Sequence, residues 1–404
     1  MKKIALIGNM NNNFYALTRY LRDAGYDAHL FYRMAMEHFQ PKADCYEEVD
    51  ESYCHKVNWL DHGFHNIDIQ AVRNQLRDFS FYIGQGEEAA AAFYAGFNID
   101  VYYPYGSDVY KYAHLPYEYK LKSKLASLFV SNSMRPTWSQ MKRGTMAKYL
   151  GGAIKNARYI FADTTNAEYQ ERIEKLEYRG LFQNVGLPLI YAKDYEKLLN
   201  GFAPEFSHRH RADELRRTHD FILLYHGRQE WQTYHNAFTV KHTDYLIRGF
   251  AKYKHENSKA KACLVMLEYG TDVDASKNLV NTLGIEDAVF WFPKMYRKEL
   301  MYLIRLSDVC CGEFAHSFLV FGTVIEAMLM KKPVITFRDD KLYSTYKELY
   351  PCYNSQTPIE ICESIKAAIN NPQERLMMGE RANDWIKEYL LRRPFEKLLE
   401  VIEQ

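Results

Sequence analysis

The chain has 404 residues, 47% of them hydrophobic and 25% charged, which is typical of a globular protein and excludes disordered and fibrous classes. This length is enough for two domains of ordinary size, and a formal net charge of +1 argues against a dedicated nucleic-acid-binding protein. Seven cysteines without a Cys-x-x-Cys pair predict reduced thiols in a cytoplasmic protein and no zinc site.

The apolar run at the amino terminus is too short for a signal peptide and is interpreted as the first strand of a β-α-β unit. A strand over 3–7, a helix over 14–24 and a strand over 28–32 fit the pattern. Gly8 and Asn9 follow the first strand, where Rossmann-like folds bind ligands, so both are candidate binding residues. The Gly-x-Gly-x-x-Gly fingerprint is missing, which argues against NAD, and a tight turn alone would also explain Gly8.

A second candidate loop follows a β-rich run that ends at Pro104 and Gly106. Ser107 and Asp108 are then expected at the carboxyl end of a strand, where they could contact a ligand. Asp108 could equally be the N-cap of the segment that follows. Both interpretations stay open.

Residues 117–150 hold seven basic side chains and one acidic one, interleaved with leucine, methionine and aromatic residues. Such a stretch is suited to an anionic membrane surface, but also to a solvated face that packs its leucines into the domain. No window approaches the 18 apolar residues of a membrane-spanning helix. We therefore expect a cytoplasmic protein, with peripheral association at the inner face of the cell membrane as the sharper alternative.

Composition divides the chain into two domains and a connection. The polar and charged segment 197–220 is predicted to be a linker between an amino-terminal domain of residues 1–196 and a second domain of residues 221–380. The second domain begins with the apolar run Phe-Ile-Leu-Leu-Tyr, which is typical of a parallel strand buried on both faces. Arg228 follows this strand.

Further β-α alternation predicts a second Rossmann-like sheet. A helix is expected from about Thr243, two residues after Lys241. The next strand, over 262–267, places Glu268 and Gly270 at its carboxyl end.

The stretch 317–337 predicts a helix with Thr323 as its N-cap, followed by a short strand. This helix is apolar nearly all round and therefore buried, so the carboxylate of Glu326 needs a partner. Thr323 and Glu326 have the spacing of a capping box, which is one interpretation. The other is a ligand site, in which the helix start at Gly322 binds a phosphate and Glu326 accepts hydrogen bonds from ribose hydroxyls.

These residues resemble the carboxy-terminal signature of retaining GT-B glycosyltransferases of the family-4 type, usually Glu-x7-Glu-Ala-Met followed by Gly-x-Pro-Val. The segment with Ser107 and Asp108 is similar to the family's His-Gly-Ser/Thr-Asp, with Tyr105 in place of the histidine. Arg228 and Lys241 resemble its Gly-Arg…Lys pair. The resemblance spans nearly the whole chain. It implies an α/β GT-B fold of two Rossmann-like domains facing a central cleft, with a carboxy-terminal helix over 381–404 that packs back on the first domain.

The resemblance also implies transfer of a sugar from a nucleotide-sugar donor to a glycan or lipid-linked acceptor, with retention of configuration, in cell-surface polysaccharide or lipopolysaccharide synthesis. Arg228 and Lys241 would stabilise the negative charge that grows on the leaving nucleoside diphosphate. The family's first glutamate, which contacts the sugar, falls on Phe318. Glu313 is the candidate to replace it, although simple solvent exposure is the other interpretation; a donor sugar that lacks the hydroxyl, such as a deoxy sugar, would need no replacement.

The predicted site thus has two groups of residues. The catalytic candidates are Arg228, Lys241 and Asp108, and the candidates for binding the nucleotide sugar are Gly322, Thr323, Glu326, Glu268, Gly270, Glu313, Gly8, Asn9 and Ser107. No Asp-x-Asp stands where a metal-bridged diphosphate would need it, so we predict metal-independent transfer without a cofactor beyond the donor. A catalytically silent GT-B scaffold subunit and a GT-B sugar-nucleotide epimerase are the alternatives.

Overall fold

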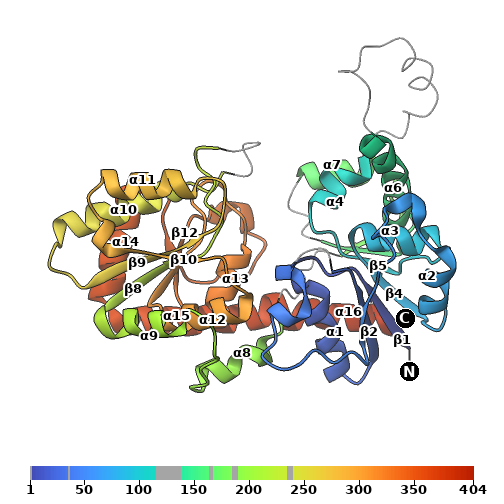
Figure 1. The fold of residues 1–404 in the computed structure, drawn as a ribbon, viewed down its shortest axis with the longest axis horizontal. Helices are drawn as coiled ribbons and strands as arrows, with labels where there is room; N and C mark the ends of the chain where they lie inside the picture. Colours follow the sequence, from blue (N-terminus) through green and yellow to red (C-terminus); the bar gives the residue numbers. More distant parts are fainter. Residues whose placement is uncertain (1, 35–36, 115–137, 163–166, 184–189, 234–239) are drawn as a thin grey trace, which may run out of the picture. The chain divides into compact units, whose positions relative to one another are not determined.

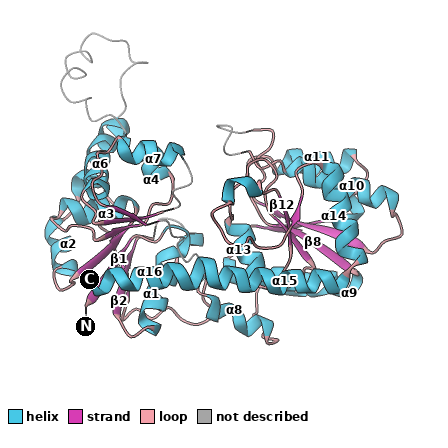
Figure 2. Cartoon of the chain, turned by 180° about the vertical axis from the view of Figure 1, so that it is seen from behind, coloured by secondary structure: helices cyan, strands magenta, loops and turns pink. Residues whose placement is uncertain are grey.

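A computed structural model describes residues 2–34, 37–114, 138–162, 167–183, 190–233 and 240–404 (Figure 1). The chain forms two compact units. The first contains residues 1–191 and 390–404, and the second contains residues 192–389. Each unit is built on a parallel sheet with helices on its faces (Figure 2).

The first unit has a seven-stranded sheet in the order β3-β2-β1-β4-β5-β6-β7 among the described residues. Every neighbouring pair of strands is parallel. The strands are β1 (Lys3–Ile7), β2 (Asp27–Tyr32), β3 (Cys54–Lys56), β4 (Phe81–Gly84), β5 (Val101–Tyr102), β6 (Tyr159–Phe161) and β7 (Leu181–Gln183).

Two hydrophobic cores cover the two faces of this sheet, because successive side chains of a strand point to opposite faces. Ile4 and Leu6 of β1 pack with α1 and α16 in one core, whereas Ala5 and Ile7 pack with α2, α3 and α6 in the other. The helices of the unit are α1 (Asn13–Asp23), α2 (Ile69–Leu76), α3 (Gly86–Tyr94), α4 (Ser107–Tyr110), α6 (Trp138–Lys155), α7 (Ala167–Glu174) and α16 (Arg393–Glu403).

The second unit has a six-stranded parallel sheet in the order β10-β9-β8-β11-β12-β13 among the described residues. All five residues of β8 are buried, as expected of a central parallel strand covered on both faces. The strands are β8 (Phe221–Tyr225), β9 (Ala262–Glu268), β10 (Val289–Pro293), β11 (Val309–Cys311), β12 (Val334–Thr336) and β13 (Tyr353–Asn354).

Helices α10 and α14 cover one face of the second sheet, where Phe250 and Ile365 pack against Leu223 and Tyr225 of β8. The helices of the unit are α8 (Ala192–Leu199), α9 (Arg209–Thr218), α10 (Thr243–Glu256), α11 (Val273–Thr282), α12 (Arg297–Leu306), α13 (Gly322–Leu329), α14 (Pro358–Asn370) and α15 (Pro372–Ile386). A π-helical segment, Lys387–Arg392, continues α15 toward α16.

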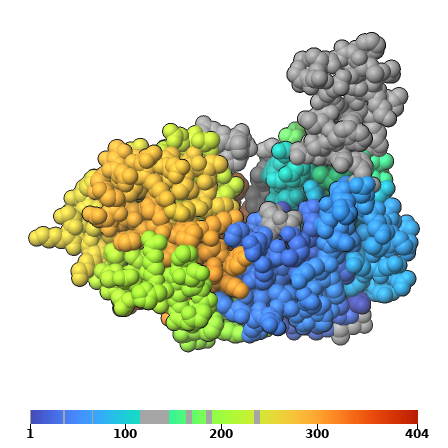
Figure 3. Space-filling view, viewed as in Figure 1, coloured from blue at the N-terminus to red at the C-terminus, as the bar shows by residue number. Residues whose placement is uncertain are grey.

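The residues expected to be a linker, 197–220, include the end of α8 and all of α9, and they belong to the second unit. They are coloured green on the surface of that unit in Figure 3. Ala212 and Leu215 are the buried residues of α9, while charged side chains make up most of the rest. The amphipathic helix is therefore so charged that its composition resembles a linker. At the other end of the chain, Leu398, Val401 and Ile402 of α16 complete a core of the first unit.

Most of the basic stretch 117–150 lies outside the described residues, which omit 115–137, so its orientation toward a membrane stays a prediction. None of the described helices combines the length and the apolar composition needed to cross a membrane.

Candidate functional site

The candidate site lies at the carboxyl edge of the second sheet, where the strand order reverses. From β8 the chain adds β9 and β10 on one side of the sheet and then places β11 on the other side. Open α/β sheets bind ligands at such a switch point. His226, Gly227 and Arg228 directly follow β8, and Glu313 follows β11, so the switch point brings the two groups to one edge.

Glu326 lies in α13 and contacts two side chains from other βα units. Its Oε1 accepts a hydrogen bond from Nε of Arg297 at 2.8 Å, and its Oε2 lies 3.0 Å from Nε2 of His226. Because an ionised carboxylate can only accept, Nε2 of His226 is the donor in this bond. Arg297 is the first residue of α12, and His226 follows β8.

The capping-box interpretation of Thr323 and Glu326 is wrong. Helix α13 begins at Gly322, its N-cap is Phe321, and no side chain caps it. Thr323 therefore lies within the first turn, and its buried Oγ1 has no hydrogen-bond partner among the described residues. The helix starts two residues earlier than expected, and the carboxylate of Glu326 contacts His226 and Arg297 instead of the helix start.

Glu326 is held in its ionised form although its side chain is only 11% exposed. Burial alone would raise its pKa, but the hydrogen bond from His226 and the Arg297 guanidinium more than offset burial and lower the pKa below its ordinary value. A buried carboxylate that stays charged is suited to accept hydrogen bonds from hydroxyl groups.

Lys241 and Glu313 form a second buried pair, with 2.6 Å between Nζ and Oε1. The expectation that Glu313 is solvent-exposed is wrong, because the residue is only 8% exposed. Its pKa is raised by burial, against the opposing effect of Lys241 and, more weakly, of Arg228. The side chain of Arg228 is 45% exposed and lies 3.1 Å from Oε1 of Glu230. The structure therefore brings Arg228, Lys241 and Glu313 together.

Buried polar atoms without hydrogen-bond partners accumulate in the loops at this edge. Buried polar atoms are usually hydrogen-bonded, and each exception calls for an explanation. Within the described residues, the unpartnered atoms at this edge are His226 Nδ1, Gln229 Oε1, Glu230 Oε2, Glu313 Oε2 and Thr323 Oγ1. A polar ligand would supply the partners that these loops lack.

Two candidates after β9 have structural roles. Glu268 is 40% exposed and forms an ion pair with Lys277 of α11, with Nζ and Oε1 2.5 Å apart. Gly270 has a φ of +120°, and a Cβ there would lie 2.4 Å from the backbone nitrogen of Gln229. The loops after β8 and β9 can approach each other this closely only with glycine at position 270.

Gly8 and Asn9 hold a loop of the first unit in place. Gly8 has a φ of +98°, and a Cβ there would lie 2.7 Å from the carbonyl oxygen of Gln85. The Asn9 side chain donates to Asn12 Oδ1 at 2.8 Å and accepts from the backbone nitrogen of Tyr15 at 2.9 Å. A tight turn and a hydrogen-bonded loop thus account for both residues without a ligand.

Asp108 is completely buried in α4, while Ser107 is exposed. Position 106, not 108, is the N-cap of this helix, so the N-cap interpretation of Asp108 is wrong. Its carboxylate instead accepts hydrogen bonds from the hydroxyl of Tyr102 at 2.8 Å and from the backbone nitrogen of Tyr105 at 3.1 Å. Burial raises its pKa to about 6, although these hydrogen bonds favour the charged form. The carboxylate therefore organises the loop after β5.

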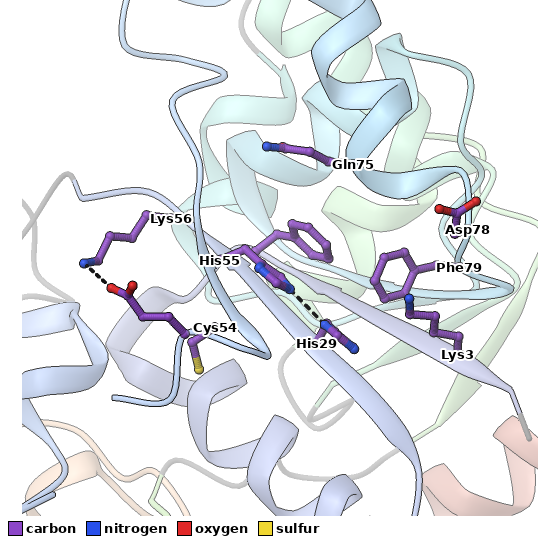
Figure 4. A pocket seen from close by; sticks show the side chains of 10 residues that line it. Lys3, His29, Cys54, His55, Lys56, Gln75, Asp78 and Phe79 are labelled. Carbon is purple, nitrogen blue, oxygen red and sulfur yellow. Dashed lines mark hydrogen bonds and ion pairs between the residues drawn. The ribbon is translucent and has the colours of Figure 1, made fainter. Parts of the chain in front are cut away.

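A surface cavity of about 450 Å³ lies elsewhere in the first unit (Figure 4). It is lined by residues of β1, β2 and β3, including His29 and His55, whose Nδ1 and Nε2 atoms are 2.8 Å apart. Lys3 at the start of β1 and Phe79 just before β4 also line it. Phe31 near the end of β2 and all three residues of β3 line it as well, so the cavity lies beside the edge strand β3.

The one cluster of three possible metal ligands within the described residues is Glu256, Cys362 and Glu363. Lys366 lies 2.7 Å from both carboxylates, and burial raises the pKa of the Cys362 thiol. A lysine between the carboxylates and a thiol that stays protonated do not fit a divalent cation.

His226 and Arg297 were not predicted from the sequence as site residues. A polar residue that ends the apolar strand β8, directly before Gly227 and Arg228, is a signal that could have pointed to His226. Arg297 carries no comparable signal, because an arginine in the first turn of an amphipathic helix is usually solvent-exposed.

Comparisons with known proteins agree with this architecture. Residues 210–385, which make up most of the second unit, match the family described as glycosyl transferases group 1. No sequence among curated proteins matches the chain. Among solved structures, Anabaena HepE in complex with UDP has 14% identity over 99% of each chain and a TM-score of 0.59. WaaG, a glycosyltransferase involved in lipopolysaccharide biosynthesis, has 15% identity over 99% of each chain and a TM-score of 0.54.

Sucrose-phosphate synthase from Thermosynechococcus elongatus has 14% identity over all of this chain and 99% of its own, with a TM-score of 0.56. The chain has the GT-B fold, which confirms the predicted fold class. The predicted enzyme class, a glycosyltransferase, is confirmed for the domain that the family match covers.

Proposed function

We propose that this chain transfers a sugar from a nucleotide-sugar donor, bound by the second unit, to a glycan or lipid-linked acceptor bound by the first. The observation that carries the proposal is the arrangement at the switch point of the second sheet. Two cations, Arg228 and Lys241, lie near one buried carboxylate, Glu313, and buried polar atoms of the same loops lack partners. The donor would supply those partners.

Each group has a role in this proposal. Arg228 and Lys241 bind the diphosphate, together with the free N–H groups at the start of α13, and stabilise the negative charge that grows as the sugar–phosphate bond breaks. Arginine offers a planar fork for phosphate oxygens, and lysine offers a compact charge. Glu326 accepts hydrogen bonds from the ribose hydroxyls.

Recognition of the sugar differs from the family pattern. Phe318 is 39% exposed and packs edge-on against Phe321, with 5.2 Å between ring centroids. Its ring cannot accept a hydrogen bond from a sugar hydroxyl as a glutamate would. We propose that Oε2 of Glu313, which has no hydrogen-bond partner among the described residues, reads that hydroxyl, or that the donor is a deoxy sugar.

The remaining features of the proposal are retention of configuration, transfer without a metal ion, and a role in cell-surface polysaccharide synthesis at the inner face of the membrane. WaaG supports the last of these only as a protein with a similar fold. Activity in the presence of EDTA tests the second feature, because a metal-dependent enzyme would lose activity with the chelator.

Thermal unfolding of the full chain with a panel of nucleoside diphosphates and nucleotide sugars tests the proposal directly. A ligand that binds only the folded state raises the melting temperature. UDP and UDP-glucose come first in the panel, because HepE has been crystallised with each of them. We expect nucleotides with one particular base to raise the melting temperature, and a product to form when an acceptor is added. No stabilisation by any member of the panel would contradict the proposal.

Phe318 also favours a second candidate, a catalytically silent GT-B subunit that acts as a scaffold. In that case a nucleotide could still bind, but no product would form with any donor and acceptor pair. Substitution of Phe318 by glutamate separates the two candidates. An active enzyme that reads its sugar in another way should lose activity with Phe318→Glu, whereas a silent subunit has none to lose.

A further inference from the structure

Glu326 is held from both sides before any ligand binds. Arg297 contacts one carboxylate oxygen and His226 contacts the other. The side chains of Arg297, His226 and Glu326 are only 14%, 1% and 11% exposed, respectively. The three residues come from α12, the end of β8 and α13, so the fold of the second sheet fixes the orientation of the carboxylate.

The Glu326 carboxylate keeps free acceptor positions after these two contacts. An ionised carboxylate has about four lone-pair positions, two on each oxygen. Arg297 uses a position on Oε1 and His226 uses one on Oε2. One position per oxygen is left, and these two positions match the neighbouring 2′ and 3′ hydroxyls of a ribose. A 2′-deoxyribose would leave one position unused.

Removing either partner should change this arrangement. A buried carboxylate without its counter-charge either takes up a proton or turns toward another donor, because an unpaired buried charge is unfavourable. In both cases it would no longer accept two hydrogen bonds in a fixed geometry. Arg297 and His226 would then act on the donor through Glu326, without touching it.

We propose that Arg297 and His226 are positioning residues that hold the Glu326 carboxylate so that it accepts both ribose hydroxyls, and that they make the site select ribonucleotide over deoxyribonucleotide donors. This inference rests on the proposed function. It narrows the donor to sugar derivatives of ribonucleoside diphosphates and excludes those of thymidine diphosphate.

Calorimetric titration with matched ligand pairs tests the inference. The ligands are UDP, ADP and GDP, each beside its 2′-deoxy counterpart, and the proteins are the wild type, Arg297→Gln and His226→Gln. A hydrogen bond to a charged acceptor corresponds to about tenfold or more in affinity, so the wild type should prefer its ribonucleotide by at least that factor. In Arg297→Gln this preference should fall to about twofold or less. The affinity for the deoxynucleotide should stay within about threefold, because Arg228 and Lys241 are unchanged.

Two further variants make the result specific. Arg305→Gln is the matched control, since Arg305 lies on the same helix and donates to the carbonyl oxygen of Phe202, away from Glu326. It should keep the wild-type preference. Arg297→Lys retains the charge but loses the planar fork, so it should fold and show an intermediate preference, which keeps the test valid if Arg297→Gln is unstable.

The possible failures are distinct. A wild-type protein that binds no nucleoside diphosphate overturns the proposed function, and the inference falls with it. A wild type that binds ribonucleotide and deoxynucleotide equally, or variants at Arg297 and His226 that retain the full wild-type preference, overturn the inference and leave the proposed function standing. A loss of stability alone would weaken both ligands of a pair equally and would leave their ratio unchanged.

Discussion

Arg228 is half-exposed, whereas its ion-pair partner Glu230 is only 12% exposed, so the pair is partly shielded from solvent. If it binds the diphosphate, Arg228→Ala should weaken the binding of a nucleoside diphosphate by about tenfold or more. The melting temperature without ligand should fall modestly, because the largely buried Glu230 loses its ion-pair partner. Calorimetric titration and thermal unfolding measure the two quantities. Arg248→Ala is a matched control, because Arg248 is 47% exposed and lies 3.9 Å from Asp244. Equal losses of affinity in both variants would argue against a role for Arg228.

Thr323 gives a second test at the scale of a single residue. Its Oγ1 is buried without a partner among the described residues, so Thr323→Val should leave the free energy of unfolding unchanged or raise it slightly. Thr357 is the comparison, because it forms a true capping box with Glu360 at the start of α14. Thr357→Val should lower the free energy of unfolding by about 1 kcal/mol. Urea denaturation measures both changes, and an equal loss at Thr323 would restore the capping-box interpretation.

Helix α16, near the end of the sequence, completes a hydrophobic core against the sheet of the first unit. Leu398 is fully buried among residues of β1 and α1, so Leu398→Ala should destabilise the first unit by about 2–5 kcal/mol. Leu376 on α15 is 58% exposed, and Leu376→Ala should change stability by less than about 0.5 kcal/mol. Urea denaturation and amide exchange of β1 report the difference. If exchange at β1 were the same in the two variants, α16 would not be part of this core.

Most helices and strands can be predicted from the sequence, but the side chains that contact one another across them cannot. Alternation of apolar strands and amphipathic helices predicts both parallel sheets, because each element must bury its own apolar face. Site residues were predicted from the sequence only where they form a local pattern, as at Arg228 and Glu326. His226 and Arg297 lie 100 and 29 residues from Glu326 in the chain. Their contacts depend on how β8, α12 and α13 pack together, which no local pattern encodes.

At the scale of the whole molecule, the two units divide the predicted site residues unequally. In the second unit, buried pairs and unpartnered polar atoms gather at one sheet edge, where the proposed ligand would supply partners. In the first unit, Gly8, Asn9 and Asp108 are used to hold their own loops. The proposed donor site therefore consists of residues that the fold leaves incompletely satisfied, whereas these residues of the first unit stabilise their own loops.

Two histidines of the first unit, His29 and His55, should make the stability of the protein depend on pH. Burial lowers the pKa of His29, with further lowering by Lys3 and Arg22 and an opposing effect of Asp27. The pKa of His55 is also lowered, first by burial and then by His29 and Lys3. Because both values lie below those of the unfolded chain, the unfolded state takes up protons first as the pH falls. The stabilisation is therefore complete above about pH 6.5, the ordinary histidine value, and is lost as the pH falls through the folded-state values.

We therefore expect the melting temperature of the wild type to fall between pH 7.5 and pH 5.5. The double variant His29→Gln/His55→Gln should show a shallower fall, because it removes the two groups that gain protons on unfolding in this range. Buried Asp108, with a pKa raised to about 6, has the opposite dependence and is common to both proteins, so it cancels in the comparison. Thermal unfolding at matched ionic strength measures the two slopes. Identical slopes would show that the histidine pair does not couple protonation to the folding of the first unit.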